Sequence, residues 1–127
     1  MDNLQFSAAD LERIDKADDL KISPFRADGH TYGTPTWIWE VVVEGALYVR
    51  AYSGISSRWY QSAIHEKAGR IHAAGMIREV AFEPVYDKLL NEKIDAAYRK
   101  KYSSSPYLAP MTGGRAGRAT IMILPKG

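Results

Sequence analysis

The chain has 127 residues, and its 17 Lys and Arg nearly balance its 15 Asp and Glu, so a formal charge of +2 gives little support for binding nucleic acid or a membrane. The sequence has no cysteine, which excludes disulfides, thiolate catalysis and zinc–thiolate sites. A chain of this length predicts one domain over residues 1–127. Because its start lacks the pattern of a secretory signal and no apolar run could span a bilayer, a cytoplasmic protein is expected.

The first elements are a helix, a short strand and a loop. Ser7 can cap a helix over Ala8–Ala17, whose Leu11 and Ile14 would face inward. Loosely alternating apolar residues then predict a strand around residues 20–25, which Pro24 places at a sheet edge or ends. Residues 26–35 contain two glycines and a proline and are expected to form a loop.

Residues 36–51 predict a β-hairpin. One strand, residues 37–43, alternates between two unlike faces, and Glu44-Gly45 provides a tight turn into a second strand ending near Ala51. A loop rich in Ser and Gly follows, residues 53–57, and leads into a helix over residues 57–68 that Gly69 would close.

The second half alternates strands and helices. Strands are expected at residues 70–74 and 76–83, the latter ended by Pro84. Residues 87–102 have helical periodicity, and Asp95 is expected to pair with Arg99 one turn later. Residues 103–118 are predicted to be a long loop, and residues 119–124 a final strand.

These elements predict an α+β fold: a small antiparallel split β-barrel of five or six strands with inserted helices. A sheet this small leaves open edges unless it closes on itself or on a partner. Because Trp37 and Trp39 give one strand much aromatic surface, we expect a homodimer that buries one face of the hairpin. The alternative is that both tryptophans lie in the core of one chain.

Four stretches carry a resemblance to a known superfamily: GTPTWIWEVVVEGALYVRA (residues 33–51), Ser53-Gly54, Arg58-Trp59-Tyr60, and GRIHAAG before the next strand. The chain resembles the flavin and deazaflavin split-barrel proteins, which are similar to pyridoxamine-phosphate oxidase, and in particular their deazaflavin-dependent nitroreductase branch. It looks closer still to a bacterial domain family of unassigned function beside that branch. Gln61-Ser62 stands where the nitroreductase branch commonly has His-Asn.

The resemblance implies a cofactor, FMN or a deazaflavin, with its phosphate at the Ser-Gly loop and its ring in the cleft of a dimer. Carried over by position, the cofactor-binding residues would be Thr36, Arg50, Ser53, Gly54, Ser56, Ser57, Arg58 and Trp59. The chemistry agrees, since Arg58 is a forked donor, serines supply hydroxyls, and a helix start offers unpaired N–H groups.

Several of these residues have structural alternatives. Arg50 could be a solvated side chain or the ion-pair partner of Glu40 or Glu79, Ser57 a helix cap and Trp59 a core residue. The three histidines show no ligand spacing, so no metal site is expected.

Two further features have no assigned role. Residues 113–118, GGRAGR, could clamp a phosphate, touch a neighbouring subunit or form an ordinary mobile loop. Tyr32, Tyr52 and Tyr107 could each donate a proton near a bound ring, and no spacing selects one of them or any other catalytic residue.

Three functional classes follow. The first is an oxidoreductase that transfers a hydride between a flavin or deazaflavin and a small substrate. The second is a non-catalytic module that binds a flavin, haem or another planar ligand. The third, a single-strand nucleic-acid binder, is disfavoured by the small net charge and by Glu40 and Glu44 among the aromatic residues.

Overall fold

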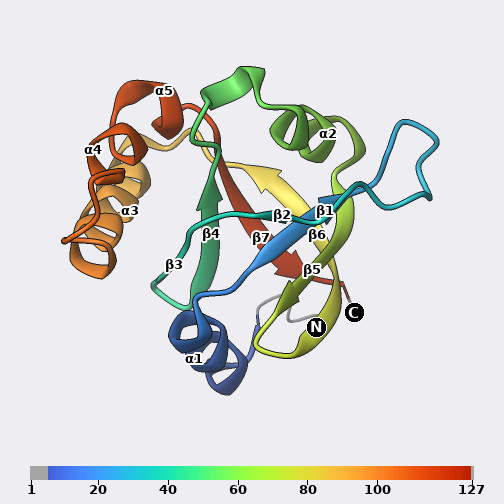
Figure 1. Cartoon of the computed structure of the whole chain (residues 1–127), viewed down its shortest axis with the longest axis horizontal. Coiled ribbons are helices and arrows are strands. Elements are labelled where there is room, and N and C mark those ends of the chain that lie inside the picture. Colours follow the sequence, from blue (N-terminus) through green and yellow to red (C-terminus); the bar gives the residue numbers. More distant parts are fainter. Residues whose placement is uncertain (1–5, 127) are drawn as a thin grey trace.

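A seven-stranded antiparallel sheet, curled into a half-barrel, forms the centre of the computed structural model, which describes residues 6–126 (Figure 1). The sheet has the order β2-β1-β5-β6-β7-β4-β3. Its strands are β1 (Lys21–Pro24), β2 (Thr36–Trp37), β3 (Glu40–Val43), β4 (Ala46–Arg50), β5 (Ala68–Ala73), β6 (Met76–Pro84) and β7 (Thr120–Pro125). The prediction of an α+β antiparallel barrel with inserted helices is confirmed, although with one or two more strands than expected.

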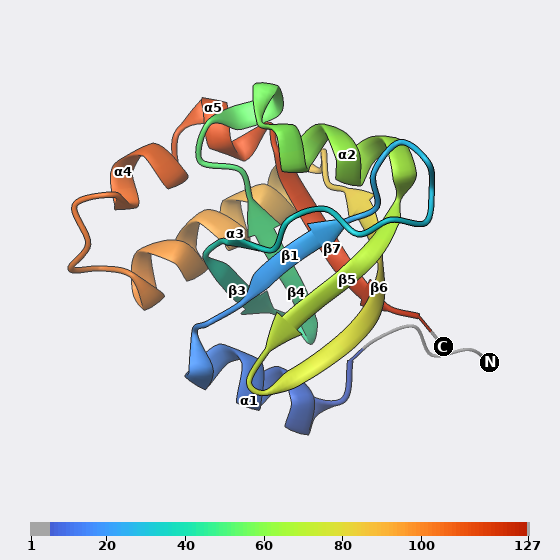
Figure 2. The same cartoon turned by 45° about the vertical axis from the view of Figure 1, so that its right-hand side comes forward.

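Helices surround the rim of the sheet. They are α1 (Ala8–Ala17), α2 (Arg58–Glu66), α3 (Lys88–Lys101), α4 (Leu108–Met111) and α5 (Gly114–Gly117), with a 3₁₀ turn, η1 (Gly54–Ser56). Figures 1 and 2 show α2, η1 and α5 at one end of the half-barrel, α1 at the other end, and α3 beside β3 and β4. Among residues 6–126, no helix has both the length and the apolar character needed to cross a membrane.

Helix α1 forms where local signals predicted it. The Ser7 hydroxyl accepts a hydrogen bond from the backbone N–H of Asp10 at 3.1 Å, which satisfies one of the unpaired donors of the first turn. Leu11 and Ile14 are buried, and Asp18 ends the helix with a left-handed φ of 48°. The predicted bounds and the inward-facing residues are confirmed.

The predicted continuous strand over residues 37–43 is wrong, because the chain breaks at Ile38 and Trp39 into β2 and β3. The two pieces are the opposite ends of the sheet: β2 pairs with β1, and β3 pairs with β4. The Ile38 N–H donates to the carbonyl oxygen of Leu20 at 3.1 Å, whereas the Trp39 ring stacks on Tyr102 with centroids 4.0 Å apart. Two residues thus carry the chain from one sheet edge to the other.

The turn of the hairpin is confirmed, since Glu44 and Gly45 have φ values of 51° and 80°. The predicted end of the next helix needs correction. Helix α2 ends at Glu66, where Lys67 takes the left-handed conformation with a φ of 59°. Gly69 lies inside β5 instead, where an added Cβ would stand 2.4 Å from the Ser23 carbonyl oxygen. It therefore permits close strand packing rather than closing a helix.

The C-terminal part agrees with the prediction in its strands and differs in its loop. β6 ends at Pro84, as expected, and α3 covers most of the predicted 87–102 helix, with Asp87 as its N-cap. The predicted loop over residues 103–118 contains the short helices α4 and α5. Asp95 pairs with Arg50 of β4 rather than with Arg99, because it lies on the face of α3 that packs on the sheet. The final strand, β7, runs between β6 and β4.

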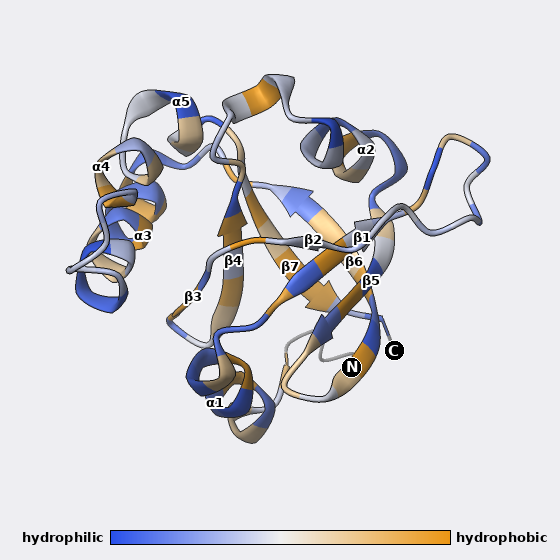
Figure 3. Cartoon of the chain, in the orientation of Figure 1, coloured by the Kyte–Doolittle hydropathy of each residue, from blue (hydrophilic) through white to orange (hydrophobic). Residues whose placement is uncertain are grey.

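Buried apolar side chains form two clusters, one on each face of the sheet. The larger cluster fills the half-barrel and includes Ile22, Leu47, Ile71, Phe82 and Ile121. The smaller cluster lies between the hairpin and α3 and includes Val41, Tyr48, Ile94 and Tyr98. Figure 3 shows β4 and β7 mainly in hydrophobic colours, whereas α3 carries both colours.

Burial on both faces bears on the expected dimer. Since the hairpin packs on the barrel interior with one face and on α3 with the other, neither face is left for a second copy. Of the two tryptophans expected at the dimer contact, Trp39 is half-buried against α3, and Trp37 is strongly exposed, at 72%. Of the two alternatives for Pro24, the second is confirmed: β1 ends at Pro24, and it is not an edge strand, because β2 and β5 flank it.

Candidate functional site

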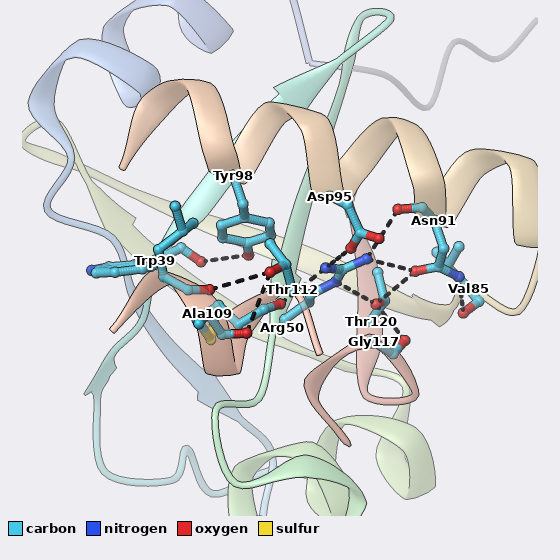
Figure 4. A network of polar contacts seen from close by, with 12 residues as sticks. Trp39, Arg50, Val85, Asn91, Asp95, Tyr98, Ala109, Thr112, Gly117 and Thr120 are labelled. Carbon is cyan, nitrogen blue, oxygen red and sulfur yellow. Dashed lines mark hydrogen bonds and ion pairs between the residues drawn. The ribbon is translucent and has the colours of Figure 1, made fainter. Parts of the chain in front are cut away.

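Arg50, at the end of β4, is a buried charge at the predicted site, with 1% exposure. All five of its N–H groups have protein acceptors (Figure 4). Nε donates to Thr120 Oγ1 at 2.9 Å, and Nη1 donates to Asp95 Oδ1 at 2.5 Å and to the Met111 carbonyl at 3.0 Å. Nη2 donates to the carbonyl and side-chain oxygens of Asn91 at 3.2 and 3.0 Å.

This network leaves Arg50 without a donor for a ligand phosphate. Its guanidinium also lies 5.4 Å from the centre of the Tyr98 ring, which covers it on the α3 side. The alternative prediction that Arg50 pairs with Glu40 or Glu79 is wrong, because its carboxylate partner is Asp95 of α3. Arg50 therefore joins β4 to β7, α3 and α4.

A cleft of about 730 Å³, which we name the main cleft, opens beside Arg50. Its lining comes from the segment before β1, from the β2–β3 connection, from the loop after β4 and the start of α2, and from the region of α4. The lining residues are Asp18, Asp19, Leu20, Thr36, Trp37, Ile38, Trp39, Arg50, Tyr52, Ser53, Ser57, Trp59, Tyr107 and Met111.

Aromatic side chains form much of this lining. Trp37, Tyr52 and Tyr107 are exposed by 72%, 48% and 60%, and the two tyrosine rings meet edge to face at 6.2 Å. Trp59 is half-buried, packing on the barrel core as its structural alternative predicted. Large aromatic side chains left open to solvent around one concavity are typical of a surface that binds a ring.

The opposite part of the main cleft is acidic. Asp18 Oδ1 accepts a hydrogen bond from the Tyr102 hydroxyl at 2.5 Å, and Asp19 Oδ1 accepts one from the backbone N–H of Ala74 at 2.9 Å. These contacts hold both carboxylates in place, and their charges disfavour an anionic group at this end.

Behind Asp18 lies a buried polar cluster. The Glu40 side chain is fully buried, and its Oε1 lies 2.8 Å from Lys101 Nζ, which also contacts Asp15 at 2.9 Å. Burial raises the pKa of Glu40 to about 8, even though Lys101 favours the charged form. Glu40 Oε2 has no hydrogen-bond partner among the residues that the structure describes.

A second concavity of about 470 Å³, which we name the arginine cleft, meets the main cleft at Ser53. Its lining residues are Ser53, Ile55, Ser56, Gly114, Arg115 and Arg118. Arg115 crosses over Gly54, where an added Cβ would stand 2.5 Å from Arg115 Cγ. Gly54 also has a φ of 80°, so both its backbone and its surroundings favour glycine.

The structure gathers most of the eight residues that the resemblance selected. Those that line the main cleft are Thr36, Arg50, Ser53, Ser57 and Trp59. Ser53 and Ser56 line the arginine cleft, and Gly54 is buried beneath Arg115. Arg58 is exposed and lines neither cleft. Ser57 is the N-cap residue of α2 by position, but its side chain makes no capping hydrogen bond.

Sequence reasoning missed part of the lining. Asp18 and Asp19 had no signal beyond ending a helix, and Trp37 was considered only as a dimer contact. Tyr107 was one of three undistinguished tyrosines; the fold selects Tyr52 and Tyr107 for the main cleft and places Tyr32 elsewhere, donating to Glu79 at 2.7 Å. Among residues 6–126, no group of three or more His, Asp or Glu side chains is arranged to hold a metal ion.

The fold and the two clefts define an α+β half-barrel protein with a ligand-sized concavity that aromatic side chains line. The chain belongs to a bacterial family: residues 10–123 match the family described as "Uncharacterized protein conserved in bacteria (DUF2255)". The predicted membership of an uncharacterised bacterial domain family is thus confirmed.

A solved structure shares the fold. The crystal structure of the conserved hypothetical protein Rv2991 from Mycobacterium tuberculosis is similar with a TM-score of 0.61 and 12% sequence identity. The match covers 98% of this chain and 82% of that one, and at this identity it supports the fold alone. No curated protein matches the chain.

Proposed function

We propose that the main cleft binds the planar ring of a flavin, FMN or a deazaflavin. The observation that carries the proposal is the convergence of Trp37, Tyr52 and Tyr107, from three distant segments, on one cleft while their rings stay exposed. Exposed aromatic faces gain by stacking on a flat ring. The resemblance to flavin and deazaflavin split-barrel proteins selects this ring type among planar ligands.

The dimensions and the polar groups of the cleft suit such a ligand. A volume of about 730 Å³ is within the range of small-molecule sites, roughly 300–1,000 Å³. Hydroxyls of Thr36, Ser53 and Ser57 lie along the same lining and offer hydrogen bonds to the polar edge of a ring. Trp59 would hold the ring by packing on it from the core side.

The chemistry that a flavin or deazaflavin supplies when bound is hydride transfer to or from a small substrate, so we propose an oxidoreductase. The protein's own residues bind and orient the ring, and the aromatic lining excludes water from one side of it. The non-catalytic binding module remains the second candidate, since the aromatic lining needs no catalytic group to hold a ring.

A fluorescence titration tests the binding proposal. Wild-type protein should bind FMN, riboflavin or a deazaflavin, and Tyr107→Ala should weaken binding about two- to tenfold, as expected for losing one aromatic contact. Tyr86→Ala is the matched control, because Tyr86 is 74% exposed and lines neither cleft. Absence of binding by the wild type to all three compounds, or equal losses in the two variants, would overturn the proposal.

Turnover then separates the two candidates. The protein loaded with a reduced flavin or deazaflavin is mixed with a small electron acceptor, and oxidation of the cofactor is followed by absorbance. Oxidation faster than for the free cofactor indicates an oxidoreductase. Binding without such an increase over a broad set of acceptors favours the binding module.

A further inference from the structure

The arginine cleft is built from two segments of the chain that contain no acidic residue. No Asp or Glu occurs between Glu44 and Glu66, and none follows Asp95, although the chain has 15 acidic residues. These two acid-free segments supply all the residues of the arginine cleft. Among residues 6–126, no carboxylate forms an ion pair with Arg115 or Arg118.

We infer that the arginine cleft binds the phosphate group of the ligand whose ring lies in the main cleft. This inference rests on the proposed function and makes it more specific: the ligand is a phosphorylated flavin or deazaflavin rather than the bare ring compound. The two clefts share Ser53, so a chain that joins ring and phosphate passes over that residue.

The geometry favours Arg115 and Arg118 over the arginines that the sequence resemblance selected. All five N–H groups of Arg50 donate to protein acceptors, and Arg58 lines neither cleft. Arg115 is positioned by its packing over Gly54, which leaves no space for a larger residue. A guanidinium presents paired donors that match two phosphate oxygens.

Hydroxyl groups complete the donor set. Ser53 and Ser56 line the same cleft from the loop after β4, facing the arginines of the α5 region. Ser56 Oγ donates to the Ser53 carbonyl at 3.3 Å, which is a long contact that a phosphate oxygen can replace. At the far end of the main cleft Asp18 and Asp19 disfavour an anion, so the ligand has one favoured orientation.

FMN and riboflavin provide the test, because they share one ring and differ by a phosphate. Their affinities for the wild type are measured by fluorescence titration. We expect FMN to bind about ten- to hundredfold more tightly than riboflavin, as charge-assisted hydrogen bonds to a phosphate allow. The double variant Arg115→Gln/Arg118→Gln should lose this preference and keep its affinity for riboflavin.

Two control variants locate the effect. Arg99→Gln changes an exposed arginine of α3 and should leave the FMN preference intact. Arg58→Gln should do the same; if it removes the preference while the double variant does not, the phosphate lies at the start of α2 and the inference is wrong. Inorganic phosphate added to the wild type should compete with FMN and leave riboflavin binding unchanged, a measurement that needs no variant to fold.

The outcomes separate the two levels of the proposal. Equal affinities of the wild type for FMN and riboflavin would overturn the phosphate site and leave the ring site standing. Binding of neither compound would end the proposed function and this inference with it. Competition by inorganic phosphate against both compounds alike would show an anion bound in the main cleft, which contradicts the assignment to Arg115 and Arg118.

Discussion

Arg50 is a single side chain that connects four elements, β4, β7, α3 and α4, through hydrogen bonds to their backbone or side-chain atoms. A buried charge is tolerated only when its hydrogen-bonding groups are satisfied, and here all five are. Its role is thus to fix the wall of the main cleft, with Asp95 as the compensating charge.

Replacing Arg50 should therefore destabilise the fold. We expect Arg50→Met to lower the free energy of unfolding by ~3–5 kcal/mol, since it leaves buried acceptors and Asp95 without their partner. Urea denaturation measures the change. Arg99→Met, at an exposed site on α3, should stay within about 0.5 kcal/mol of the wild type. A change in the free energy of unfolding for Arg50→Met as small as that for Arg99→Met would mean that the Arg50 network contributes little to stability.

Glu40 should make stability depend on pH. Its folded-state pKa of about 8 lies above its ordinary value of 4.5, so between these values the folded protein keeps a proton that the unfolded chain has lost. The contribution of Glu40 to stability is therefore fully present below pH 4.5, its ordinary pKa. It is lost as the pH rises through the folded-state pKa of about 8. The charged groups that face Glu40 are Lys101, Asp18 and Asp15, of which only Lys101 favours ionisation.

Glu40→Gln checks this assignment, because glutamine keeps the size of the side chain and cannot ionise. Between about pH 5 and pH 8, the wild type should lose stability on the order of a few kcal/mol relative to the variant. Chemical denaturation at several pH values gives both curves. Parallel curves for the two proteins would rule out Glu40 as the titrating group.

At the scale of elements, the curvature of the sheet depends on close contact between β1 and β5. Gly69 of β5 has backbone atoms of Ser23 and Pro24 within 2.6 Å of the place where a Cβ would stand. We expect Gly69→Ala to cost at least ~1–3 kcal/mol of stability through overpacking, measured as a fall in thermal or urea midpoint. Gly117→Ala is the control: its added Cβ meets nothing within 4 Å, and a near-neutral result is expected there. Equal effects would contradict the steric argument.

Elements with local signals were predictable from the sequence. Ser7 caps α1, Glu44-Gly45 turns the hairpin and Pro84 ends β6, each by interactions within a few residues. The break at Ile38 and Trp39 has no such local cause. It follows from the curl of the whole sheet and from the stacking of Trp39 on Tyr102, more than sixty residues away.

Only the part of the candidate site that has a local sequence signal was predictable. The loop after β4 could be identified from its serines and glycine, and it does line both clefts. Tyr107, Arg115 and Arg118 reach the same place only because the segment after α3 folds back over η1, as α4 and α5. Nor could the sequence show that Asp95 forms its ion pair with Arg50, since the i,i+4 spacing from Asp95 to Arg99 also suits an ion pair.

For the whole molecule, the rim of the main cleft is an exposed surface rich in aromatic side chains. Both hairpin faces pack within the chain, so we expect a second copy to contact this rim, where Trp37 is the most exposed ring. We expect light scattering to give twice the 14.2 kDa of one chain, and Trp37→Glu to give one chain mass. Tyr86→Glu, an equally exposed aromatic site, should not change the assembly. A wild-type protein that scatters as a single chain would contradict the expected homodimer.

The position of β7 between β6 and β4 has a consequence for biosynthesis. While a ribosome still holds Thr120–Pro125, the emerged strands can form only two separate pieces, β2-β1-β5-β6 and β4-β3, with no strand to join them. Each piece then has an unpaired edge, at β6 in one and at β4 in the other. We therefore expect the half-barrel to close only after β7 has emerged, because β7 is the strand that pairs with both β6 and β4.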